Sequence, residues 1–167
     1  MGVTIHYAGR LKDEAAYDAA IAIARDFAQA QGWSCADIPE EVRHLERMSE
    51  EEEWTYDGPT RGVELHPHPQ CEPVRLEFDR ELYLQNYTKT QFAPIEVHIA
   101  VTGLLHALAP CFAALAVNDE AEYFDTGNRE RLAQSIEWGN STLRALTGPD
   151  AKVGVKLPSG RILDAGG

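Results

Sequence analysis

A short segment of the chain places two histidines and a cysteine at a spacing that could hold a metal ion. The segment reads HPHPQC and contains His66, His68 and Cys71. Side chains at positions i and i+2 of a strand point to one face, so the two imidazoles can share an ion and the thiolate can join them. Zinc motifs usually draw ligands from two separate segments, and no second segment here has matching spacing. The sequence therefore leaves open a divalent metal such as zinc, and we favour a surface loop stiffened by its prolines.

A second group of polar residues precedes a predicted helix. Thr88, Lys89, Thr90 and Gln91 lie just before Pro94, where the helix is expected to begin. A helix N-terminus offers unpaired N–H groups and the positive end of the helix dipole to a phosphate or carboxylate. The segment lacks the glycines of a P-loop, so a polar loop that caps the helix is the simpler interpretation. Of the two candidate ligand sites, this anion site is the better supported.

Most of the negative charge lies in one stretch of the chain. Between Asp37 and Asp57 there are nine acidic residues and two arginines, a net of −7 out of −12 for the whole chain. Such a run is typical of a solvated connector, because like charges repel and gain nothing from burial. It also fits an acidic patch that docks a basic partner by electrostatic attraction, with neighbouring aromatic anchors. The candidate partner-binding residues are Glu50, Glu51, Glu52, Glu53, Trp54 and Tyr56.

Other reactive side chains show no catalytic pattern. No serine has the G-x-S-x-G context of a nucleophile elbow. A satisfied or partly exposed histidine is the expected state of both His98 and His106. The acids from Asp119 to Asp125 precede a predicted helix and are interpreted as a solvated rim.

Composition restricts the classes of function. The chain has 167 residues, of which 44% are hydrophobic and 25% charged. These fractions indicate a globular protein of one domain spanning 1–167. A net charge of −12 argues against nucleic acid and anionic lipid, which are bound by neutralising phosphates with Lys and Arg.

The expected location is cytoplasmic. Residues 97–117 carry no formal charge, but polar residues spread along the run favour a buried core over a membrane span. The N-terminus lacks the pattern of a secretory signal. Three widely spaced cysteines do not form a disulfide framework.

Hydrophobic periodicity predicts the elements that position these residues. Residues 3–7 alternate as a strand, and a helix follows with Asp13 as its N-cap and Gly32 as its C-cap. Further strands are predicted over 33–38, 61–66, 74–78, 82–86 and 112–117, with shorter ones over 120–124 and in the tail from 153 to 163, and further helices begin at 94 and at 126–128. The acidic stretch, 37–57, is interpreted as a connector between these elements.

The fold class that follows is α+β. We expect about three helices packed on a mostly antiparallel or mixed sheet of five to seven strands. The order strand–loop–helix–strand over 3–38 recurs over 83–117, which leaves a repeated β-α-β unit open.

Two functions from different classes fit these features. One is a small binding module, which docks a basic protein through the acidic stretch or holds a small anionic ligand in the polar loop. The other is a small metal- or anion-dependent enzyme with a site near His66, His68 and Lys89. Whether the protein is an enzyme stays open, and we favour the binding module because no catalytic signature is present.

Overall fold

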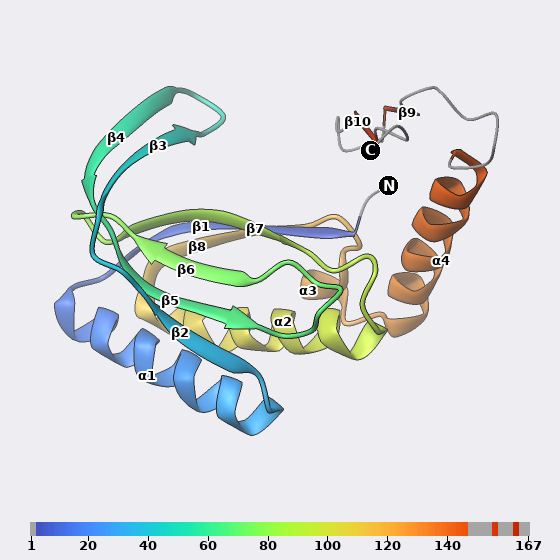
Figure 1. Ribbon diagram of the computed structural model, residues 1–167, viewed down its shortest axis with the longest axis horizontal. Helices are drawn as coiled ribbons and strands as arrows, with labels where there is room; N and C mark the ends of the chain where they lie inside the picture. The colour runs from blue at the N-terminus through green and yellow to red at the C-terminus, as the bar shows by residue number, and fades with distance from the viewer. Residues whose placement is uncertain (1–2, 147–154, 157–161, 164–167) are drawn as a thin grey trace.

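The computed structural model describes residues 3–146, 155–156 and 162–163, and its architecture is α+β (Figure 1). The strands are β1 (Thr4–Leu11), β2 (Ser34–Ile38), β3 (Val42–Met48), β4 (Glu53–Pro59), β5 (Arg61–His66), β6 (Val74–Phe78), β7 (Tyr83–Lys89), β8 (Phe112–Asp119), β9 (Val155–Lys156) and β10 (Ile162–Leu163). The helices are α1 (Glu14–Gln31), α2 (Ile95–Leu108), α3 (Tyr123–Thr126) and α4 (Arg129–Leu146), with a 3-10 turn, η1 (Ala109–Cys111), after α2. The predicted fold class is thus confirmed, while the number and grouping of the strands differ from the prediction.

The predicted caps of the first helix are confirmed. The Asp13 carboxylate accepts from the backbone N–H of Ala16 at 2.8 Å, which satisfies one of the donors left free at a helix start. Gly32 ends the helix with φ of 73°, a left-handed conformation that glycine adopts without strain. The sequence therefore determines both ends of α1 through local chemistry.

The described strands form two three-stranded antiparallel sheets and two separate hairpins, β3–β4 and β9–β10. One sheet has the order β2-β5-β6 and the other β7-β1-β8, and β3 pairs only with β4. β6 and β7 lie side by side, so the two sheets are neighbours along these edge strands (Figure 1). Instead of one continuous sheet of five to seven strands, the chain builds two half-sheets that meet at β6 and β7.

Among the described residues, backbone hydrogen bonds join the two half-sheets at the ends of β6 and β7. At one end the Glu72 N–H donates to the Lys89 carbonyl at 3.1 Å, and at the other the Asp79 N–H donates to the Tyr83 carbonyl at 3.0 Å. Between these points no ladder is formed within the described part of the chain.

The Tyr7 side chain fills the gap between the half-sheets. Its hydroxyl accepts from the Arg75 N–H at 3.2 Å and lies 3.0 Å from the Thr88 hydroxyl. Thr88 in turn donates to the Pro73 carbonyl at 3.1 Å. Because a buried backbone donor without an acceptor is costly, Tyr7 replaces a missing ladder bond with a side-chain bond.

Helices α1 and α2 cover one face of the sheets, and the β3–β4 hairpin rises from the opposite face (Figure 1). The largest cluster of buried apolar side chains lies between the helices and the strands, and it includes Ile5, Leu65, Leu76, Leu84 and Leu104. Both β-α-β units of the predicted recurrence exist, as β1-α1-β2 and β7-α2-β8. No helix within the described ranges is long and apolar enough to cross a membrane.

Two predicted elements differ in the structure. Residues 42–59, within the stretch interpreted as a connector, form the β3–β4 hairpin, whose inner residues such as Leu45 and Trp54 are half-buried. Residues 120–124, predicted as a short strand, instead form a turn that leads into α3, with Glu122 in a left-handed conformation. The alternation in the tail indicates a terminal hairpin or an edge strand, and β9 and β10 pair as an antiparallel hairpin. The turn that the sequence predicts at 158–160 and the helix stop that it predicts at 148–149 lie outside the described residues.

Candidate functional site

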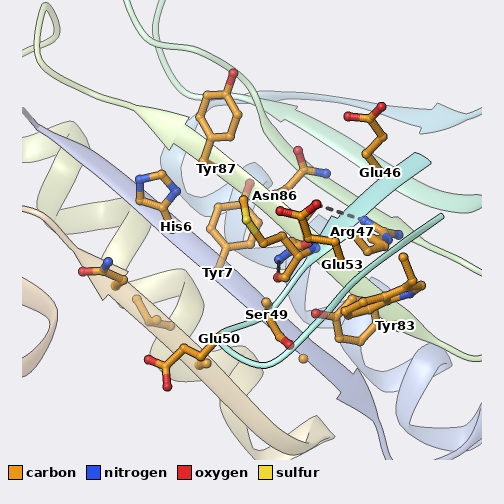
Figure 2. A pocket seen from close by; sticks show the side chains of 18 of the residues that line it. His6, Tyr7, Glu46, Arg47, Ser49, Glu50, Glu53, Tyr83, Asn86 and Tyr87 are labelled. Atoms are coloured by element: carbon orange, nitrogen blue, oxygen red, sulfur yellow. Dashed lines mark hydrogen bonds between the residues drawn. The ribbon is translucent and has the colours of Figure 1, made fainter. Parts of the chain in front are cut away.

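A groove of about 1230 Å³ lies between the β3–β4 hairpin and the sheet face not covered by α1 and α2 (Figure 2). The hairpin, residues 42–59, is called the acidic hairpin below. Figure 2 labels Glu46, Arg47, Ser49, Glu50 and Glu53 from the hairpin side, and His6, Tyr7, Tyr83, Asn86 and Tyr87 from β1 and β7. Ala8, Gly9, Met48, Trp54, Thr55, Gln85, Ala116, Val117 and Asn118 complete the lining.

The floor of the groove follows from strand register. His6 on β1 stands beside Tyr87 on β7 and Asn118 on β8, and Ala8 stands beside Gln85 and Ala116. Alternate residues of a strand share a face, so these two rows lie on the same side of the sheet. One row of the floor therefore presents two alanines and the Gln85 amide, and the other presents His6, Tyr87 and Asn118.

One wall of the groove is acidic. Glu46 and Met48 lie on one face of β3, and their cross-strand partners are Thr55 and Glu53. Glu50 lies in the turn of the hairpin. In this turn the Ser49 hydroxyl accepts from the N–H groups of Glu51 and Glu52. All three carboxylates belong to exposed residues. No described lysine or arginine forms an ion pair with any of them.

The other face of the hairpin packs on the turn between β6 and β7. Arg47 and its cross-strand partner Trp54 both contact Tyr83. The guanidinium carbon of Arg47 lies 5.3 Å from the centroid of the Tyr83 ring, and the ring centroids of Trp54 and Tyr83 are 5.8 Å apart. The Tyr56 hydroxyl donates to the Pro59 carbonyl and accepts from the Arg80 N–H. These contacts hold the base of the acidic hairpin against the sheet.

Arg47 is the one buried cation among the lining residues and is 4% exposed. Its Nη1 donates to the Gln85 carbonyl at 3.2 Å, and its Nη2 lies 3.8 Å from the Asp79 carboxylate. The Nε and Nη2 atoms have no hydrogen-bond acceptor in the described structure. Because Asp79 balances the charge of Arg47, the acidic wall keeps its negative potential.

The predicted partner-binding residues separate into three groups. Glu50, Glu53 and Trp54 line the groove. Glu51 and Glu52 are exposed in the turn and do not line it. Tyr56 anchors the base of the hairpin through its hydroxyl.

The three predicted metal ligands each have other contacts. His66 Nε2 lies 3.1 Å from the Glu64 carboxylate, and His68 Nδ1 accepts from the Gln70 N–H at 3.0 Å. Burial and the neighbouring Glu72 charge raise the pKa of the Cys71 thiol to about 12, which disfavours the thiolate that binds metals. No group of three or more His, Cys, Asp or Glu side chains is placed to hold a metal within the described residues.

Two of the four predicted anion-binding residues, Thr88 and Lys89, lie in a strand, because β7 extends to Lys89. The hydroxyls of Thr88 and Thr90 are buried and bonded, to Tyr7 and to His98 respectively. Gln91 is also buried, and the Lys89 ammonium lies 5.3 Å from the Phe92 ring centroid. The structure thus places three of the four side chains inside the protein.

The two loops required by the enzyme hypothesis are neighbours. Glu72, next to Cys71, accepts from the Lys89 N–H through its carboxylate at 3.0 Å. This contact is between Glu72 and the backbone of Lys89, and it brings no histidine to the lysine ammonium.

A buried chain of polar groups connects Thr90, His98 and Asp119. The Thr90 hydroxyl is 2.6 Å from His98 Nδ1, and His98 Nε2 is 2.9 Å from Asp119 Oδ2. Burial raises the pKa of Asp119, but the His98 bond and two backbone N–H donors outweigh it, so the pKa is held below its usual value. An ionised carboxylate only accepts, so His98 Nε2 is the donor.

The series Thr90–His98–Asp119 has the order hydroxyl–imidazole–carboxylate of a hydrolase triad. All three residues are buried, however, and none of them lines the groove. A nucleophile must reach its substrate, so these three side chains have a structural role: they tie the start of α2 to the ends of β7 and β8. The prediction of a satisfied histidine at position 98 is confirmed. The prediction that Asp119 belongs to a solvated rim is wrong, because the fold turns its side chain inward.

The floor of the groove is not among the sites predicted from the sequence. Alternation in residues 4–8 predicts that His6 lies on the face opposite Ile5 and Tyr7, and this was the available signal. Tyr87 and Asn118 come from distant segments, and only the pairing of β7 and β8 with β1 places them beside His6.

In comparisons with known proteins, no protein-family model, no curated protein and no solved structure matches the chain.

Proposed function

We propose that this protein is a binding module whose groove accepts a basic, extended segment of a partner protein. The observation that carries the proposal is the acidic wall formed by Glu46, Glu50 and Glu53 above a floor that contains Tyr87. None of the three carboxylates has a cationic partner in the described structure. Their charge is therefore available to a ligand.

The chemistry of the lining suits lysine and arginine side chains. Their aliphatic stems pack on apolar or aromatic surface while the charged ends remain near water or carboxylates. Met48 is 61% exposed and Tyr87 49% exposed, so the groove offers such surface beside the carboxylates. Cations also bind favourably over aromatic faces.

Long-range electrostatics supports the same ligand class. The chain has a net charge of −12, so a basic segment is attracted before contact and an acidic one is repelled. Binding should therefore be fast and should weaken with salt, since exposed charges are screened over about 8 Å at physiological ionic strength.

The test measures fluorescence anisotropy of a short, labelled, lysine-rich peptide titrated with the protein. The E46Q/E50Q/E53Q variant should weaken binding at least about tenfold, since it removes three facing charges. The matched control is D18N/D26N/E137Q, which removes three exposed charges outside the groove and should leave affinity within about twofold. Equal losses in both variants would show a general charge effect and would refute the groove as the site.

A second comparison separates the groove from a diffuse charged surface. A Tyr87→Ala variant keeps the net charge and removes an aromatic side chain from the floor. It should weaken peptide binding several-fold with little change in the salt dependence. Unchanged affinity for the lysine-rich peptide would contradict a ligand seated on the floor.

A further inference from the structure

The outer edge of β8 carries backbone groups that no neighbouring strand uses. β8 pairs with β1 on one side and with no other strand in the described structure. The Glu120 N–H donates to the Thr4 carbonyl, which marks this cross-strand pair as hydrogen bonded. Since bonded and non-bonded pairs alternate in an antiparallel ladder, Asn118 and Ala116 also bond to β1.

The N–H and C=O groups of Leu115 and Val117 therefore point away from β1. The hydrogen bonds on the other side of β1 agree with this assignment. There the Thr90 N–H donates to the Val3 carbonyl, so by the same alternation the backbones of Ile5, Tyr7 and Gly9 bond to β7. Tyr7 and Gly9 are the residues that stand opposite Val117 and Leu115. No described group bonds to the backbone of Leu115 or Val117 on the free side.

This edge lacks the usual protection against pairing. Free edges in native proteins are typically short, or carry Lys, Pro or inward charges that block another strand. β8 spans eight residues, Phe112–Asp119, and its sequence FAALAVND has no charge or proline before its last residue. Ala113, Ala114 and Ala116 are exposed, and their side chains are small enough for another strand to approach.

We propose that β8 pairs antiparallel with β8 of a second copy of this chain, to form a two-fold symmetric dimer with a continuous sheet. The absence of charge on seven successive residues allows two copies to meet here even though each carries −12 in total. A two-fold antiparallel contact is self-complementary, so the same groups on each copy satisfy one another.

Charges at the two ends of the strand favour the same arrangement. Lys12 lies at the start of β8, where its N–H donates to the Cys111 carbonyl. Asp125 lies at the other end, in α3, which is tied to β8 by the bond from the Phe124 N–H to Asp119. Neither Lys12 nor Asp125 has an ion pair with a described residue, and antiparallel pairing brings Lys12 of each copy toward Asp125 of the other.

The dimer and the groove share β8, because Ala116, Val117 and Asn118 line the groove, but the dimer uses backbone groups of the outer edge and the acidic wall lies on the hairpin. In a two-fold antiparallel pair, equivalent faces of the two sheets lie on one side of the dimer. The grooves of both copies therefore open on the face opposite α1 and α2. The E46Q/E50Q/E53Q variant should therefore dimerise like the native chain. Main-chain hydrogen bonds depend little on salt, so the dimer should persist at a salt concentration that abolishes binding of the lysine-rich peptide.

The first test is sedimentation equilibrium of the full chain over a range of concentrations. We expect a reversible monomer–dimer equilibrium. The A114K/A116K variant places lysines of the two copies beside one another and should raise the dimer dissociation constant at least about tenfold. The control is A19K/A22K, which adds the same charge on the exposed face of α1 and should leave the constant within about twofold.

Hydrogen–deuterium exchange identifies the surface directly. In the dimer the Leu115 and Val117 amides should be protected, and their exchange should accelerate on dilution. The Ala116 amide, bonded to β1, should be protected at both concentrations. A chain that stays monomeric at every concentration would overturn the proposal. So would a dimer that A114K/A116K leaves intact or that leaves the Leu115 and Val117 amides unprotected.

Discussion

The side-chain amide of Gln85 on β7 pairs with the backbone of Met48 at the end of β3. The Met48 N–H donates to Gln85 Oε1 at 3.0 Å, and Gln85 Nε2 donates to the Met48 carbonyl at 2.5 Å. The amide therefore bonds to Met48 as a strand would, although β3 shares no ladder with the sheet. This contact ties the far end of the acidic hairpin to the floor of the groove.

Replacing Gln85 by Ala should loosen the acidic hairpin without unfolding the protein. Both bonds are lost, but Met48 is exposed and water can replace them, so we expect about 1 kcal/mol of destabilisation. The Met48 amide should exchange at least about tenfold faster by hydrogen–deuterium exchange. Gln29→Ala, at an exposed position of α1, is the control. Unchanged exchange at Met48 would show that other contacts hold the hairpin end.

Replacing Tyr7 by Phe should destabilise the junction of the two half-sheets. The change removes the acceptor of the partly buried Arg75 N–H and the partner of the buried Thr88 hydroxyl, at a cost of about 1 to 3 kcal/mol. Urea unfolding measures this cost. Tyr87→Phe, at a half-exposed ring, should change stability by less than about 0.5 kcal/mol. Equal stability of the Tyr7 variant and the native chain would refute the joining role of the hydroxyl.

Tyr7 should also be visible in an alkaline titration. Burial, partly offset by the Thr88 and Arg75 bonds, raises its pKa to about 12 from the usual 10.0. Because the folded pKa is higher than the unfolded one, its stabilising contribution is complete below about pH 10 and is lost as pH rises toward 12. Burial also raises the pKa of Tyr17, so ultraviolet absorbance should show Tyr7 as the last of the six tyrosines to ionise, and that last step should vanish in the Tyr7→Phe variant. A late step that remains would belong to another tyrosine.

Asp119 should make the protein sensitive to acid. Its pKa is lowered in the folded state, so its contribution is present above the unfolded value of about 3.9 and is lost as pH falls through the folded value. Asp119→Asn should cost about 3 kcal/mol near neutral pH, because an amide cannot accept from His98 and two backbone donors equally well. Urea midpoints measured from pH 3 to 7 should fall less steeply toward acid in this variant than in the native chain. Asp26→Asn, at an exposed position of α1, should keep the native profile.

Gly62 should be the glycine least tolerant of substitution. Its φ is 147°, and an added Cβ would lie 1.7 Å from the Leu76 carbonyl oxygen. Gly62→Ala must move β5 away from β6 and should cost more than about 3 kcal/mol. Gly127 also has positive φ, at 62°, but its Cβ would enter open space, so Gly127→Ala should cost about 1 kcal/mol. Similar thermal shifts for the two variants would contradict this difference in backbone contact.

The Cys71 thiol should react slowly in the folded protein. With its pKa raised to about 12, the thiolate fraction at pH 8 is reduced at least about a hundredfold relative to an unperturbed cysteine. A chain with Cys35→Ser and Cys111→Ser isolates this thiol for reaction with a disulfide reagent, folded and in urea. Rapid reaction of the folded chain would show an accessible thiolate and would revive the metal hypothesis for His66, His68 and Cys71.

Local features of the sequence determine the parts of the fold that depend on near neighbours. The ends of α1 follow from Asp13 and Gly32, because capping needs only residues within one turn. The alternation of Val63 and Leu65 predicts β5 and its buried face for the same reason. The α+β class follows from the order of such elements.

The acidic stretch shows the limit of local reasoning. Charge repulsion favours a solvated connector, but Arg47, Trp54 and Tyr56 find contacts on Tyr83 and Arg80 that outweigh it. Those partners are more than twenty residues away in the chain, so no local pattern indicates them.

The candidate sites depended on tertiary structure even more strongly. The sequence by itself determined that the chain is acidic, that Glu50, Glu53 and Trp54 lie close together, and that alternate residues of β1 face opposite sides. Only the fold decided that Tyr87 and Asn118 stand beside His6, and that Thr88 and Thr90 are turned into the core. The physical reason is that strand pairing joins residues distant in sequence, and a register shift of one residue would move each side chain to the other face.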